Sequence, residues 1–141
     1  MKLMDLSLLI AAGASFVVGL LGYIIARFWI KPIARYNITK RKLNHELTQY
    51  LAQMTDTVGP EKKKTHSRGN ETGRTARKHA LNLVTYYGED IPYWYRLLLD
   101  SRKESPTEAL VLLTTLSKIR DPEQIIDRID SVRKKMGLRN K

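Results

Sequence analysis

The N-terminal part of the chain has the most pronounced hydrophobic pattern. No charged residue occurs over the 21 positions from Leu6 to Ala26. An α-helix of that length rises about 31 Å, which is close to the hydrocarbon thickness of a bilayer. The pattern predicts a transmembrane anchor within residues 1–30, with the span running from about Leu6 to Ile30.

The flanks of this segment favour an anchor over a cleaved signal peptide, which would need a basic stretch ahead of its apolar core. Lys2 is balanced by Asp5, and the basic residues follow the segment instead. These are Arg27, Lys31, Arg35, Lys40, Arg41 and Lys42. Because the cytoplasmic flanks of membrane helices are rich in Lys and Arg, we expect the N-terminus outside and the rest of the chain in the cytoplasm.

Small residues recur at spacings of three and four within the predicted span. They are Ala11, Ser15, Gly19, Gly22 and Ala26. At these spacings they share one helix face, and small side chains let two helices approach closely in lipid. The stripe is consistent with self-association of the span, although glycine and alanine are also common in membrane helices in general.

Residues 31–54 show the pattern of an amphipathic helix. Pro32 suits the first turn, and apolar residues then repeat along one face. These are Leu43, Leu47, Tyr50, Leu51 and Met54. The narrow stripe predicts a juxtamembrane helix that pairs with copies of itself or lies on the membrane surface. Residues 55–74 contain three glycines, one proline and a lysine triplet, which predicts a flexible basic linker.

Residues 75–141 are predicted to form a small cytoplasmic domain of four short helices. Apolar positions repeat at helical spacing in four blocks, and no segment alternates as a strand would. The residues expected to begin or end these helices are Gly88, Asp90, Pro92, Ser105, Glu108, Asp121, Gln124 and Gly137. Ser105 with Glu108, and Asp121 with Gln124, have the spacing of capping boxes, whereas the glycines suit left-handed stops. The predicted fold class is therefore all-α.

The residue types offer little for catalysis. The chain has no cysteine, which excludes disulfides, thiol chemistry and cysteine-bound zinc. His45, His66 and His79 lie in separate segments without metal-ligand spacing, and no nucleophile motif occurs. Carboxylate pairs such as Asp127 and Asp130 stand among Lys and Arg, where solvated ion pairs are the ordinary explanation. We expect no enzyme, with no catalytic or metal-binding residue and no cofactor.

Charge points to one candidate binding site. The net charge is +11, and Arg74, Arg77, Lys78 and His79 gather where the first helix of the predicted domain begins. Cations are misplaced at a helix N-terminus unless an anion joins them, because the free amides and the helix dipole favour negative charge. The cluster suggests a phosphate site, and the alternative is a solvated basic turn.

Aromatic residues are dense just after this cluster, with four tyrosines and one tryptophan between positions 86 and 95. Exposed aromatic side chains beside cations can stack on nucleobases, and they are equally enriched in subunit interfaces. We include Tyr86 and Tyr95 in the candidate ligand site with the four basic residues.

The span Leu6 to Ile30, the basic connector through Arg74 and the basic, aromatic domain from Thr75 onward together resemble the CRISPR-associated membrane effectors of type III systems. The resemblance lies in this architecture. It implies a homo-oligomer, with a tetramer as the working number, in the bacterial inner (cytoplasmic) membrane. It further implies that a cyclic oligoadenylate binds on the cytoplasmic side and that the membrane is then perturbed in antiviral defence.

Two other functions fit the same residues. The chain could be a non-catalytic membrane tether that docks a partner protein, which predicts an exposed apolar and aromatic patch around Tyr93 to Leu99. The basic segments could also bind nucleic acid directly, with steep salt dependence, although we do not expect double-stranded nucleic acid as a partner. In each case anionic membrane lipids are expected partners of the juxtamembrane cations.

Overall fold

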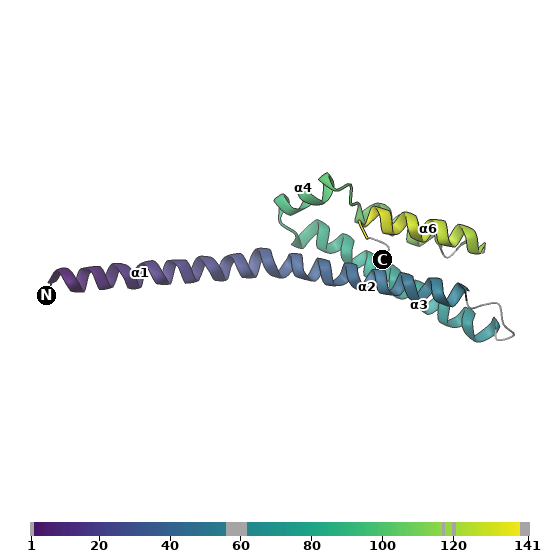
Figure 1. Cartoon of the computed structure of the whole chain (residues 1–141), viewed down its shortest axis with the longest axis horizontal. Helices are drawn as coiled ribbons and strands as arrows, with labels where there is room; N and C mark the ends of the chain where they lie inside the picture. The colour runs from purple at the N-terminus through teal and green to yellow at the C-terminus, as the bar shows by residue number, and fades with distance from the viewer. Residues whose placement is uncertain (1, 56–61, 117, 120, 139–141) are drawn as a thin grey trace.

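One uninterrupted helix forms the long axis of the molecule (Figure 1). It consists of α1 (Lys2–Ile25), the π-helical turn η1 (Ala26–Ile30) and α2 (Lys31–Thr55). The structure is a computed structural model that describes residues 2–55, 62–116, 118–119 and 121–138, and in these ranges it is all-helical, with no strand. The predicted all-α class is therefore confirmed.

The first half of this helix makes no core. Every side chain from residue 5 to residue 30 is exposed, and the helix is long and apolar enough to cross a membrane. In water such a surface would be buried, because apolar area is driven out of contact with solvent. A helix that is hydrophobic on all sides and unburied is what a lipid environment accommodates.

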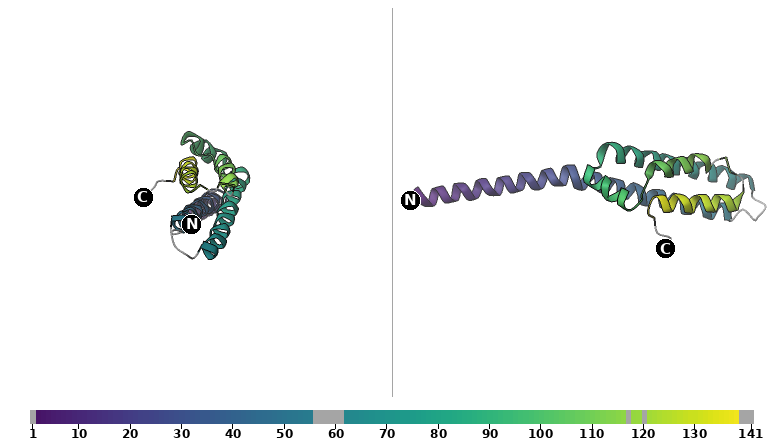
Figure 2. Two further views of the ribbon diagram at one scale, coloured as in Figure 1. Left: turned by 90° about the vertical axis from the view of Figure 1, so that its right-hand side faces the viewer. Right: turned by 90° about the horizontal axis from the view of Figure 1, so that it is seen from above.

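The second half belongs to a bundle of helices. α3 (Lys62–Thr85) runs back along α2, α5 (Pro106–Leu116) packs on α3, and α6 (Pro122–Lys135) packs on α5 and contacts α2 (Figure 2). The π-helical turn η2 (Tyr86–Asp90) leads from α3 into α4 (Tyr93–Ser101), which lies at the end of the bundle nearest α1 (Figure 1).

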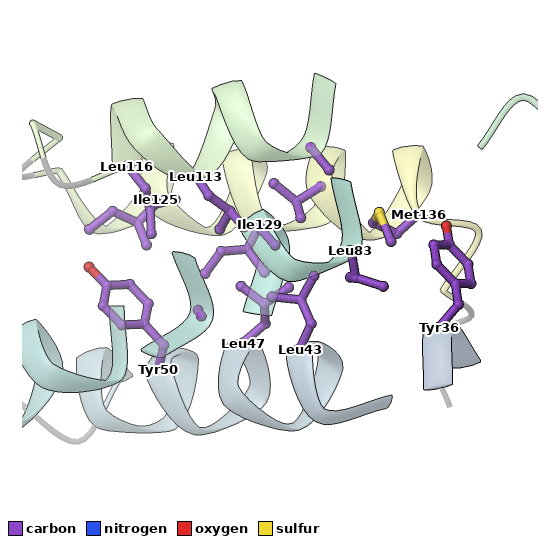
Figure 3. Packing of buried hydrophobic residues seen from close by; sticks show 14 of the residues in the cluster. Tyr36, Leu43, Leu47, Tyr50, Leu83, Leu113, Leu116, Ile125, Ile129 and Met136 are labelled. Carbon is purple, nitrogen blue, oxygen red and sulfur yellow. The ribbon is translucent and has the colours of Figure 1, made fainter. Parts of the chain in front are cut away.

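The core lies between α2, α3, α5 and α6. Leu43 and Leu47 project from α2 toward Leu113 of α5 and Ile129 of α6 (Figure 3). Tyr36 stands at the end of the core closer to α1, beside Met136 (Figure 3). The largest fully buried side chains are Tyr36, Leu43, Leu47, Leu83, Ile91, Leu99, Ile129, Met136, Val132 and Pro106.

The structure does not show residues 31–54 in the predicted role. The prediction for them is a separate helix that pairs with its own copies or lies on the membrane. The apolar stripe of α2 is buried by α3 and α6 of the same chain. The predicted domain boundary at residue 75 accordingly falls inside the bundle, since α2 supplies Tyr36, Leu43, Leu47 and Tyr50 to its core. A unit of about 60 residues is only marginally stable because it buries a small share of its surface, and α2 adds a further side to the core.

The predicted linker over residues 55–74 is wrong for its second half, because α3 already begins at Lys62. Residues 56–61 lie outside the described part of the chain. The glycines of α3 mark close contact with α2: a Cβ on Gly69 would lie 3.2 Å from Met54 Cε, and one on Gly73 would lie 3.4 Å from Tyr50 Cε2. Packing against α2 thus outweighs the low helix propensity of glycine, which costs about 1 kcal/mol per residue.

The predicted helix ends are correct in part. The Asp121 carboxylate accepts a hydrogen bond from the Glu123 amide at the start of α6, and Gly137 ends that helix with a left-handed φ of +59°. Gly88 does not close a helix, because it lies inside η2 without a positive φ. The i to i−5 hydrogen bond from Ile91 N to Tyr86 O closes that turn instead.

The capping box at the start of α5 is only half formed. The Ser105 hydroxyl accepts a hydrogen bond from the Glu108 amide, at 3.4 Å. Glu108 does not reach back to Ser105, because its carboxylate pairs with Lys135. The Ser105 amide donates instead to the Lys135 carbonyl, at 2.8 Å. The end of α6 therefore supplies the acceptor that the sequence pattern assigned to the glutamate.

Candidate functional site

The four basic residues of the predicted ligand site lie in the middle of α3. Because α3 begins at Lys62, Arg74 is three turns into the helix and has no free N-terminal amide beside it. The premise that Arg74, Arg77, Lys78 and His79 surround a helix N-terminus is therefore wrong. The helix dipole gives these cations no reason to gather an anion, since its effect is confined to the first turn.

These side chains also point in different directions. Arg74 and Lys78 are exposed, whereas Arg77 and His79 are half-buried. Arg77 and His79 are two positions apart in the sequence, so a rotation of about 200° around the helix axis separates them. The structure brings Arg74 and Lys78 together on the outer face of α3, one turn apart, and places Arg77 and His79 on opposite flanks.

The two tyrosines of the predicted site contribute to packing. Tyr86 lies in η2 and Tyr95 in α4, and both are half-buried against the core. The Tyr95 ring meets the Trp94 ring edge to face, with centroids 5.6 Å apart. A substitution of Tyr95 would therefore disturb the core as well as any surface, so Tyr95 is a poor probe of binding.

The exposed patch expected around Tyr93 to Leu99 is present on α4. Tyr93 is 74% exposed, Trp94 48% and Leu97 51%, with Leu98 also exposed, whereas Leu99 is buried. Trp94 also contacts Trp29 of η1, at a centroid distance of 6.0 Å and an interplanar angle of 66°. The sequence indicated this patch by its composition, but not its position beside the end of the apolar helix.

A hydrogen-bond network fixes the position of α4. The Arg96 guanidinium donates to the Gly88 carbonyl at 2.6 Å and to the Ile91 carbonyl at 3.1 Å, and it lies over the Tyr87 ring. The Tyr87 hydroxyl donates to Asp100 at 2.7 Å. That hydrogen bond is the main cause of the raised pKa of Tyr87, because only the neutral phenol can donate it to the Asp100 carboxylate. These contacts hold η2 against α4.

A buried ion pair joins α2 to the loop between α4 and α5. Lys40 Nζ lies 2.6 Å from Glu104 Oε2, and both side chains are largely excluded from solvent. Tyr36 is fully buried in the same region, and its hydroxyl has no hydrogen-bond partner among the described residues. Burial, with the charge of Glu104 as a second cause, raises the pKa of Tyr36 well above its ordinary value. Sequence patterns gave no sign of this cluster, because its members come from distant segments.

Charge is distributed unequally between the two halves of the bundle. α2 and α3 together contain twelve basic and two acidic residues, whereas α4, α5 and α6 contain five of each. The exposed basic residues of this pair of helices include Lys31, Arg35, Arg41, Lys42, Arg74 and Lys78. We call this surface the α2–α3 basic face.

Neither a metal centre nor a match to a known protein adds to this picture. In the described ranges no three His, Asp or Glu side chains gather in a way that could hold a metal ion. No protein-family model, curated protein sequence or solved structure matches the chain. The resemblance to CRISPR-associated effectors therefore rests on sequence architecture alone.

Proposed function

We propose that the protein is a non-catalytic membrane tether: α1 crosses the membrane, and the bundle on its cytoplasmic side docks an acidic partner protein on the α2–α3 basic face. The observation that carries this proposal is the uninterrupted helix from Asp5 to Thr55, which joins an apolar, unburied half to a half inside the bundle core. A joint of this kind fixes the bundle at the membrane without a flexible linker.

The distance of Arg74 and Lys78 from the membrane favours a partner other than lipid. Gly73 faces Tyr50, and Tyr50 follows Ile30 by 20 residues, so this level is about 30 Å along the helix axis from the end of the apolar segment. The Debye length is about 8 Å at physiological ionic strength. Arg74 and Lys78 are therefore screened from lipid head groups, in contrast to Arg27 and Lys31 at the apolar end.

The partner is expected to be acidic because the basic face lacks internal compensation. Arg74 and Lys78 form no ion pair with any described residue. Complementary charge on a partner would speed association and select against other basic surfaces. The proposed orientation rests on a different set of charges, because Arg27, Lys31 and Arg35, next to the apolar segment, favour the cytoplasmic side.

The anchor and its orientation are tested with single cysteines, because the natural chain has none. Asp5→Cys, just before the apolar segment, and Thr107→Cys, on the exposed start of α5, are labelled in intact cells with a reagent that cannot cross the membrane. The proposal expects labelling at position 5 only. Labelling at position 107 in intact cells would contradict the orientation, and release of the protein by alkaline washing would contradict the anchor.

Docking is tested by crosslinking from inside the cell. A photoreactive residue replaces Leu81, which is exposed on the outer face of α3, and the matched site is Val111, exposed on α5. The proposal expects a defined adduct from position 81 that disappears in Arg74→Glu/Lys78→Glu. A control of equal charge change is Lys118→Glu/Lys134→Glu, which should keep the adduct. Loss of the adduct in both double variants would show that docking depends on total charge, and would contradict a specific role of Arg74 and Lys78.

The nucleotide-gated effector stays the second candidate, supported by the unpaired Arg74 and Lys78 on one face of α3. It makes a different prediction for purified full-length protein in detergent. A cyclic oligonucleotide at 100 times its dissociation constant should stabilise the bundle by about 2.7 kcal/mol, and the stabilisation should vanish in Arg74→Glu/Lys78→Glu. A thermal shift of this kind would select the effector over the tether.

A further inference from the structure

The outer face of α4 is apolar and largely exposed. Tyr93, Trp94, Leu97 and Leu98 are exposed, and at 100° per residue they occupy one continuous arc of the helix. Leu99 is buried on the opposite side of α4, and Ile91 is buried just before the helix. α4 therefore has one apolar side in the core and a second apolar side facing away from the bundle.

The exposed face continues the surface of the apolar helix. The Trp94 ring contacts the Trp29 ring, and Phe28, Trp29 and Ile30 are themselves exposed. Since Trp29 closes the apolar segment, the contact places Trp94 at the same level along the helix axis. Figure 1 shows α4 at this end of the bundle.

Exposed basic residues flank Trp29 and follow α4, whereas the exposed acidic residues Glu89 and Asp90 precede α4. The basic residues are attracted to anionic lipid head groups. Arg27 and Lys31 are exposed on either side of Trp29, and Arg102 and Lys103 are exposed directly after α4. Lys103 adopts a left-handed φ of +57°, and the Glu104 amide then donates to the Leu99 carbonyl at 3.0 Å. This ends α4 sharply and leaves both cations at the edge of the patch.

We propose that α4 is a second membrane contact, whose face of Tyr93, Trp94, Leu97 and Leu98 lies in the head-group layer beside α1. The inference rests on the proposed anchoring of α1. Tryptophan and tyrosine prefer that layer because their rings are apolar and their polar atoms stay hydrated. An amphipathic helix with such a face buries it about 5–10 Å into the interface. The bundle would then meet the membrane at two points and could not swing about η1.

A bilayer fits this face better than a second copy of the chain does. The patch is a single short helix whose apolar surface merges with that of α1, which lipid must already cover if α1 spans the membrane. A copy bound to α4 would also have to contact the lipid around Trp29. Self-association through α4 is an outcome of the test.

The chain contains two tryptophans, Trp29 and Trp94, so two variants separate the two membrane contacts. Trp94→Phe leaves Trp29 as the reporter of α1, and Trp29→Phe leaves Trp94 as the reporter of α4. Each full-length variant is reconstituted in vesicles of phosphatidylcholine and phosphatidylglycerol. Some of these lipids are brominated high in the acyl chain, where bromine quenches nearby tryptophan emission. Trp29→Phe/Trp94→Phe/Ile126→Trp is the control, because Ile126 is exposed near the start of α6. The neighbouring Ile125 lies at the Tyr50 end of the core, opposite Tyr36 (Figure 3).

The inference expects quenching by brominated lipid of both Trp29 and Trp94, and none of the tryptophan at position 126. Leu97→Glu should reduce the quenching of Trp94 without changing the unfolding temperature, because the Leu97 side chain is exposed. If Trp29 is quenched and Trp94 is open to aqueous acrylamide, α4 is not at the membrane and the inference is overturned while the anchor stands.

Failure of the anchor itself gives a different result, because Trp29 would then escape quenching as well. A second copy on α4 would shield Trp94 from both lipid and acrylamide, and this shielding would be lost as protein is diluted into excess lipid. That outcome would also overturn the inference.

Discussion

α1 and α2 are two halves of one helix that differ in what surrounds them. α1 has exposed apolar side chains on every face, whereas α2 confines its large apolar residues to one stripe and buries that stripe in the bundle. The backbone continues from one to the other through η1. The side chains alone therefore decide which half is suited to lipid and which half to protein.

The difference shows why apolar content does not measure a helix's part in folding. In α1 the apolar side chains pack against no other part of the bundle, so truncating one of them should leave the fold intact. In α2 each buried side chain is packed on several sides, and its removal leaves a cavity. Substitutions matched between the two halves should make this contrast measurable.

The largest expected effect is that of Leu47→Ala in α2. Leu47 is buried at the centre of the core, and a cavity at such a site lowers the free energy of unfolding by about 4 kcal/mol. Leu9→Ala is the matched change in α1, where Leu9 is exposed, and should leave the unfolding curve of the bundle unchanged. Denaturant unfolding in detergent measures both. Equal effects of the two substitutions would contradict the contrast.

The next largest effect concerns polar burial, which occurs in α2 and not in α1. Lys40→Met should lower the free energy of unfolding by about 3 kcal/mol, because Glu104 would be left buried without its counter-ion. Lys135→Met breaks a pair with Glu108 that is exposed at both ends, and exposed pairs contribute less than about 1 kcal/mol. The same unfolding assay compares the two variants, and restored stability in Lys40→Met/Glu104→Leu would show that the orphaned carboxylate was the cause.

A smaller effect is expected from adding one methyl group. Gly137 has a positive φ, and a Cβ there would overlap Glu104. Gly137→Ala should therefore lower the free energy of unfolding by about 2 kcal/mol. Gly19 of α1 has nothing within 4 Å of the same position, so Gly19→Ala should not change unfolding. If Gly19→Ala instead lowers the mass of the protein in detergent, the small-residue stripe of α1 holds copies together.

The smallest expected effect belongs to the Tyr36 hydroxyl. Tyr36→Phe removes a buried donor that has no partner among the described residues, so the free energy of unfolding at neutral pH should rise by about 1 kcal/mol. Tyr23→Phe, at an exposed site in α1, should change nothing.

Tyr36 also makes the free energy of unfolding depend on pH, with a sign that follows from its raised pKa. The pKa of Tyr36 is raised in the folded state, so above about pH 10 the unfolded chain loses a proton that the folded chain keeps. Stability should therefore be complete below that pH and fall as pH rises beyond it. Tyr36→Phe should show a shallower fall, and an unchanged slope would contradict the assignment to Tyr36.

The sequence predicts α1 and most helix ends because those features depend on neighbouring residues. The uncharged run from Leu6, the Asp121 cap and the Gly137 stop are all local patterns, and the structure confirms them. The pairing of α2 with α3 could not be read this way. In the sequence Gly69 and Gly73 are typical of a linker, and only the folded chain shows that they pack closely against Met54 and Tyr50.

The candidate site was harder to predict for the same reason. The anion-binding argument depended on where α3 begins, and α3 starts at Lys62, well before Arg74. Its part ahead of Arg74 packs along α2, with Gly69 near Met54 and Gly73 near Tyr50. Lys40 and Glu104 are 64 positions apart, so no spacing rule could join them. The aromatic patch on α4 was visible in composition, but its contact with Trp29 needed the folded chain.

The π-helical turn η1 sets the angular phase between the two halves of the long helix. A π-turn acts as one residue inserted into an α-helix, and one residue corresponds to about 100° of rotation. The faces of α1 and the core-facing stripe of α2 are thus held at a fixed angle. If copies of α1 meet on the stripe of Ala11, Ser15 and Gly19, each bundle projects from the common axis with the same face outward. Deleting one residue in η1 would turn each bundle by about 100° about its own long helix and leave the stripe of α1 and the core of the bundle unaltered.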